Sequence, residues 1–133
     1  MREDLYKLKR LRDTLIGLEM DISVTENELI ILNRDLHYME IAESTLCENL
    51  KILKKEKVIA MASQYKKTVN ELEYIGEKIK TYREHINRLE NNLQKLLNKH
   101  NIYMTDYKAQ KKVVDNQKVI LYFDPKKRKK SEG

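Results

Sequence analysis

Residues that make turns are scarce in this sequence. It holds one Pro and three Gly in 133 residues, whereas an average globular chain has about 5% Pro and about 7% Gly. Trp is absent, and charged residues make up 36% of the chain. So few turn residues cannot serve the many connections of a β-sandwich or barrel, and a collagen-like array is excluded too. Long, solvent-exposed helices are what this composition favours.

Cysteine and long apolar runs are also scarce. Cys47 is the single cysteine, so one chain can form neither a disulfide nor a cysteine-based zinc site, and we expect a reducing compartment. No run of 18 apolar residues occurs, so no membrane span and no membrane partner are expected. The charged start MREDLYKLKR is not typical of a signal peptide. We therefore expect a cytoplasmic protein, or a nuclear one in a eukaryotic host.

Residue patterns that carry chemistry are missing as well. Gly17, Gly76 and Gly133 are isolated, so there is no Gly-rich phosphate loop. The three histidines lack the i, i+4 spacing of a helical metal pair. We therefore predict no catalytic residue, no metal site and no cofactor, and a protein that is not an enzyme.

Apolar residues recur with the alternating three- and four-residue spacing of a coiled coil. One frame runs from Leu8 to Leu53 and a second from Val58 to Tyr103, and 12 of the 14 positions in each are apolar or Tyr. Such a repeat keeps one apolar seam turned toward a partner helix. The predicted oligomerisation seam is Leu15, Leu18, Ile22, Leu29, Leu32, Leu36, Met39, Leu46, Leu50, Leu53, Leu72, Ile75, Ile79, Ile86, Leu89, Leu93 and Leu96.

A five-residue step separates the two frames. It is compatible with a skip residue in one long helix, or with a helical hairpin that turns between residues 54 and 68. The absence of Gly and Pro from this stretch favours the continuous helix. A capping-box spacing at Thr68 favours the hairpin, and the same spacing at Thr25 and Thr45 leaves a break near either position open.

The distribution of charge favours an antiparallel arrangement. The net charge is −5 over residues 1–50, +6 over residues 51–100 and +5 over residues 101–133. An acidic half and a basic half attract when they are laid antiparallel, whereas a parallel pair would place like charges side by side. We therefore predict an all-α fold, with a long helical hairpin or antiparallel coiled coil over residues 1–104.

The first half of the chain also has apolar residues outside the seam. A two-stranded coiled coil buries only a narrow stripe, whereas a helix in a bundle buries a wider face. We therefore expect the hairpin to form a homodimeric bundle along residues 15–53. The extra apolar residues are Ile16, Met20, Val24, Ile30, Ile31, Tyr38, Ile41 and Ile52.

Beyond Tyr103 the residue types change. β-Branched and aromatic residues cluster over residues 112–114 and 118–123, with turn-forming residues between them. We therefore predict a short β-hairpin over residues 105–124, packed on the helix end or on another chain because a lone hairpin is marginal in water.

The last residues, 125–133, are predicted to form a disordered basic tail. Its five consecutive basic residues suit phosphate contacts, nuclear import or solubility alone. The predicted phosphate contacts are Lys126, Lys127, Arg128, Lys129 and Lys130.

These features support two functional hypotheses. The first is a non-enzymatic scaffold or adaptor that dimerises through its helices and presents its C-terminal end to a protein partner. The alternative is a nucleic-acid-associated protein that binds phosphates through its basic second half and tail. The hypotheses differ in their driving force, which is apolar burial in the first and counterion release in the second.

Overall fold

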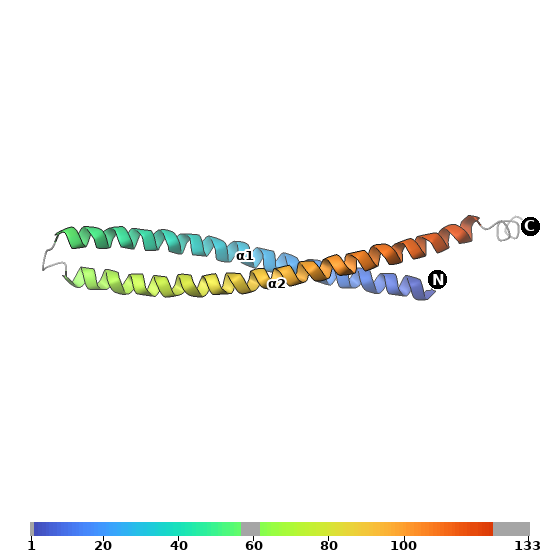
Figure 1. The fold of residues 1–133 in the computed structure, drawn as a ribbon, viewed down its shortest axis with the longest axis horizontal. Coiled ribbons are helices and arrows are strands. Elements are labelled where there is room, and N and C mark those ends of the chain that lie inside the picture. Colours follow the sequence, from blue (N-terminus) through green and yellow to red (C-terminus); the bar gives the residue numbers. More distant parts are fainter. Residues whose placement is uncertain (1, 57–61, 124–133) are drawn as a thin grey trace, which may run out of the picture. The chain divides into compact units, whose positions relative to one another are not determined.

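The protein is a helical hairpin in a computed structural model, which describes residues 2–56 and 62–123 (Figure 1). Helix α1 spans Arg2–Glu56 and helix α2 spans Ala62–Phe123, and the two pack antiparallel. The connection, residues 57–61, lies outside the described residues and within the predicted turn interval. The hairpin prediction is therefore confirmed, and the continuous helix is excluded.

Neither helix breaks at the threonines that resemble N-caps. The Thr45 hydroxyl donates a hydrogen bond of 3.0 Å to the Ile41 carbonyl, and the Thr68 hydroxyl donates one of 2.9 Å to the Gln64 carbonyl. A hydroxyl that bonds back to the preceding turn is satisfied inside a helix and does not begin one. Helix α1 also continues through Thr25, so the breaks considered near residues 25 and 45 do not occur.

The chain divides into two compact units. One consists of Met1–Val24 with Gln94–Gly133, and the other of Thr25–Leu93. In each unit a stretch of α1 pairs with a stretch of α2, and apolar side chains are buried at their interface. These are Leu15, Leu18 and Val114 in the first unit, and Leu29, Ile79 and Ile86 in the second.

The β-hairpin predicted for residues 105–124 is replaced by helix, because α2 continues to Phe123. The heptad frame runs past Tyr103 through Tyr107, Gln110, Val114 and Gln117, all of which are buried or half-buried. The β-propensity of residues such as Val114 depends on a sheet against which they can pack. Here the first turns of α1 supply a helical partner instead, so tertiary packing overrides the local preference.

Candidate interaction surface

The predicted seam residues lie where α1 and α2 meet. All of them are buried or half-buried, and the most buried is Ile79, at 3% exposed. Within one chain only the opposite helix can cover them, so the structure brings the seam residues of α1 and α2 together in each unit. The seam therefore serves pairing inside the chain, and its part in oligomerisation stays a prediction.

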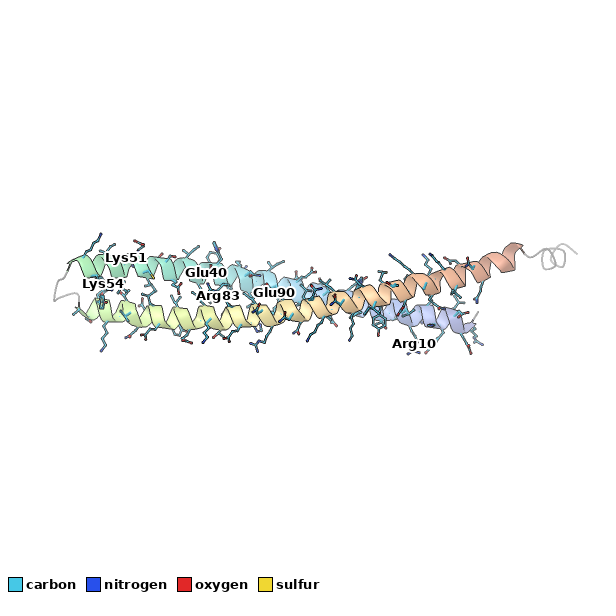
Figure 2. All side chains as sticks on the ribbon, viewed as in Figure 1. Arg10, Glu40, Lys51, Lys54, Arg83 and Glu90 are labelled. Carbon is cyan, nitrogen blue, oxygen red and sulfur yellow. The ribbon has the colours of Figure 1, made fainter. Side chains whose placement is uncertain are left out.

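Ion pairs in the Thr25–Leu93 unit join an acid on α1 to a base on α2. Glu40 Oε1 lies 3.2 Å from Arg83 Nη2, and both residues are labelled in Figure 2. Glu28 Oε1 lies 3.6 Å from His85 Nε2. An acidic residue on α1 facing a basic residue on α2 is what the distribution of charge along the sequence predicts. Because the Glu40 and Arg83 side chains are exposed, this pair is worth about 0.2–1 kcal/mol. The pairs therefore influence helix orientation more than they stabilise the fold.

The unit of Met1–Val24 with Gln94–Gly133 holds a partly buried polar cluster at the start of α1. Gln110 Nε2 donates hydrogen bonds to the Asp4 carbonyl oxygen at 3.0 Å and to Asp4 Oδ1 at 3.3 Å. Gln117 Nε2 donates one of 2.7 Å to Asp4 Oδ2. The hydrogen bonds from Gln117 and Gln110 stabilise the carboxylate and hold the pKa of Asp4 below its ordinary value of 3.8.

Sequence reasoning missed this cluster. The signal that could have revealed it is the spacing of Tyr103, Tyr107, Gln110, Val114 and Gln117, which keeps the alternation of four and three. Gln110 and Gln117 place polar side chains at seam positions. The apolar repeat by itself therefore fades beyond Tyr103, although the heptad spacing continues. Gln117 Oε1 is buried without a hydrogen-bond partner among the residues that the structure describes.

A second group of apolar side chains is left uncovered on α1. In the Thr25–Leu93 unit, Ile30 is 66% exposed and Tyr38 is 63% exposed, and Ile31, Ile41 and Ile52 are each about half exposed. Large exposed apolar groups that gather on one face mark interaction surfaces. These five belong to the set predicted from the sequence to face a second copy, and none of them is buried by the part of the chain that the structure describes.

The outer face of α2 in the same unit differs in character. Its large exposed apolar residue, among those that the structure describes, is Tyr74, and the face is otherwise occupied by polar and charged residues such as Lys67 and Arg88. Uncovered apolar surface in this unit therefore belongs mainly to α1.

Hollows that could hold a small molecule are shallow. One on α2 is lined by Ser63, Lys66, Lys67, Asn70, Glu71 and Tyr74, all of which are exposed. A ligand there would contact one helix, unlike the enclosed clefts in which proteins bind small molecules. No group of three or more His, Cys, Asp or Glu residues able to hold a metal occurs in the described part of the chain.

The five predicted phosphate contacts, residues 126–130, lie outside the described residues. Across residues 2–56 and 62–123, neither helix contains an apolar stretch that could cross a bilayer. No protein-family model, curated protein or solved structure gives a significant match to this chain. The proposed function therefore rests on the geometry of the helices and on the sequence.

Proposed function

We propose that the protein is a non-enzymatic coiled-coil scaffold or adaptor that forms a homodimer and presents its C-terminal end to a protein partner. The observation that carries this proposal is the exposed apolar face of α1 in the Thr25–Leu93 unit. The seam residues are already used between α1 and α2, so residues such as Ile31 and Ile41 are available for a second chain.

The cost of leaving this face in water supports the proposal. Burying apolar surface is worth about 25 cal/mol per Å², and fully burying a side chain of the size of Ile is worth about 1.5–3 kcal/mol. Scattered exposed apolar residues are ordinary, but these five lie on the outer face of a single helix. A second chain on this face would recover that free energy.

Light scattering of the full chain at micromolar concentration tests the dimer. We expect a mass about twice 15.9 kDa, with helicity unchanged on moderate dilution. A mass of one chain with full helicity would contradict the homodimer.

The basic run at residues 126–130 favours a second candidate function, association with nucleic acid. Five phosphate contacts on duplex DNA would give a log-log salt dependence with a slope of about −4.5. Such contacts carry no sequence information.

Capture of host partners before and after nuclease treatment separates the two functions. The adaptor function predicts a protein that stays bound in stoichiometric amount after nuclease treatment and at about 300 mM salt. The nucleic-acid function predicts that both treatments release what was captured, because phosphate contacts weaken steeply with salt.

A further inference from the structure

The outer face of α1 in the Thr25–Leu93 unit carries a second three-four repeat, opposite the seam. We call this repeat the outer stripe. Every member is exposed, and four of the nine are apolar or Tyr, interspersed with polar and charged ones. The outer stripe consists of Asn27, Ile31, Arg34, Tyr38, Ile41, Thr45, Glu48, Ile52 and Lys55.

The outer stripe is nearly symmetric about Ile41. Arg34 lies seven residues before it and Glu48 seven residues after it, while Ile31 and Ile52 lie ten before and eleven after. A second copy turned about a two-fold axis at Ile41 would therefore place its Ile52 opposite Ile31 and its Glu48 opposite Arg34. Ile31 then meets Ile52 and Arg34 meets Glu48, while Tyr38 lies opposite Thr45 and Asn27 opposite Lys55.

The charges of the outer stripe are exposed and only locally paired. The Arg34 side chain is 62% exposed and lies 3.6 Å from Asp35, and the Glu48 side chain is 69% exposed and lies 3.4 Å from Lys51. Both pairs join near neighbours on α1, and exposed pairs of this kind are weak. A parallel dimer would set Arg34 against Arg34 and Glu48 against Glu48, whereas an antiparallel one forms two opposite-charge pairs.

We propose that two copies of the chain dock antiparallel through the outer stripe, with the two-fold axis at Ile41. The proposal rests on the homodimer of the proposed function and gives it a surface and an orientation. The outer stripe is about 43 Å long at 1.5 Å per residue, which is about four heptads, and its apolar members Ile31, Tyr38, Ile41 and Ile52 span three of them. In this unit α2 exposes Tyr74 but no comparable stripe, so the surface belongs to α1.

The first test places a charge at the two-fold axis. Ile41→Lys sets two ammonium groups face to face, so light scattering should show the mass of one chain while circular dichroism shows unchanged helicity. Tyr74→Lys, on the outer face of α2, is the matched control and should stay dimeric.

The outcomes of this test separate the proposals. A wild-type chain that is monomeric contradicts both the homodimer and the outer-stripe interface. A dimer that survives Ile41→Lys leaves the homodimer standing and overturns the outer stripe as its interface.

A charge swap tests the orientation without adding charge to an apolar position. Arg34→Glu should weaken dimerisation roughly tenfold, because it turns two attractive contacts into repulsive ones. Adding Glu48→Arg should restore the affinity, and Arg88→Glu on α2 is the control for the change in net charge. A double variant as weak as Arg34→Glu alone would overturn the antiparallel arrangement.

Distances between spin labels give a geometric readout. Cys47 is exposed and lies six residues from Ile41, so labels on the two copies should be about 18 Å apart along the helix axis. Moving the label one heptad onward, with Lys54→Cys in a Cys47→Ser background (Lys54 is labelled in Figure 2), should increase the separation to about 39 Å. A separation that is the same for both labels would indicate a parallel dimer and overturn the proposal.

Discussion

Gln117 donates a hydrogen bond of 2.7 Å to the carboxylate of Asp4, across 113 positions of sequence. With Gln110, it joins the beginning of α1 to the last turns of α2 within one unit. Heptad repeats alone permit helices to slip by seven residues, since each slip again aligns apolar seams. A slip that moves Gln117 to the place of Gln110 would leave Gln110, which is 7% exposed, buried without its acceptor, at a cost of about 1–3 kcal/mol. The opposite slip moves Gln110 to the place of Gln117 and keeps one hydrogen bond to Asp4 in place of three. The polar cluster therefore opposes a slip in either direction, and more strongly the slip that buries Gln110 without an acceptor.

The heptad frame at the end of α2 can be tested with two adjacent valines. Val114 is 1% exposed and Val113 is 43% exposed. Val114→Ala should lower the free energy of unfolding by about 1.5–2.5 kcal/mol, because two buried methyl groups are lost and a small cavity remains. Val113→Ala should cost well under 1 kcal/mol. Equal losses for the two variants, measured by urea unfolding, would contradict the frame.

The Asp4 cluster predicts a dependence of stability on pH. Because the pKa of Asp4 is lower in the folded chain than its ordinary 3.8, its ionised form stabilises the fold above that value. This contribution is lost as the pH falls through the lowered pKa. Asp4→Asn removes the charge, so its thermal midpoint should fall less than that of the wild type between pH 6 and pH 3.

Asp13→Asn is the control for this experiment, since Asp13 is an exposed acid on the same stretch of α1. Its thermal midpoint should follow the wild-type curve with pH. A pH dependence of Asp4→Asn that matches the wild type would show that the cluster adds nothing to acid sensitivity.

The pairing of Glu40 with Arg83 predicts an energetic coupling between the two helices. The side chains are 43% and 62% exposed and meet at 3.2 Å. A double-mutant cycle with Glu40→Gln and Arg83→Gln should give a coupling free energy of about 0.2–1 kcal/mol that falls as salt is added. The same cycle on Glu40 and Arg88 should give none, and a coupling of similar size there would mean that general charge attraction explains the first result.

The basic tail predicts where affinity for nucleic acid would reside. Truncation after Pro125 removes residues 126–133, which include the basic run, and should abolish most binding to a random DNA duplex at about 50 mM salt. Helicity and the number of chains per particle should stay the same. If the truncated chain binds equally well, the helices are the phosphate surface. If neither form binds at that salt concentration, the nucleic-acid function is wrong.

The seam of the hairpin could be derived from the sequence because its signal is periodic. The residues from Leu15 to Leu53 and from Leu72 to Leu96 repeat every 3.5 positions on average, and only a helix with one covered face needs such spacing. The opposite net charges of the two halves also predicted that the helices pack antiparallel. The heptad period and the net charge of each half both depend on many residues. A single polar seam position such as Thr25 or Glu43 therefore does not change either prediction.

The end of α2 could not be derived in the same way. Locally, Val113, Val114 and the residues from 118 to 123 prefer strand, and Gln110 and Gln117 interrupt the apolar repeat. At Gln110, Val114 and Gln117 the helix is supported by α1, whose first turn supplies Asp4 as an acceptor for both glutamines. Contacts between residues more than 100 positions apart therefore set the helical conformation here. A residue's intrinsic preference for strand is worth less than a satisfied buried hydrogen bond and a covered side chain.

What the sequence determined by itself was therefore the class of fold, the seam and the antiparallel sense, all of which follow from period and charge. The tertiary structure decided that α1 ends at Glu56, that α2 begins at Ala62 and continues to Phe123 in place of the expected strands, and that the seam is covered within one chain. The physical reason is that one helix can bury only one face of another. Period and charge suit a hairpin and an antiparallel dimer of unbroken helices alike, so only the tertiary structure shows that the chain's own α2 covers the seam of α1.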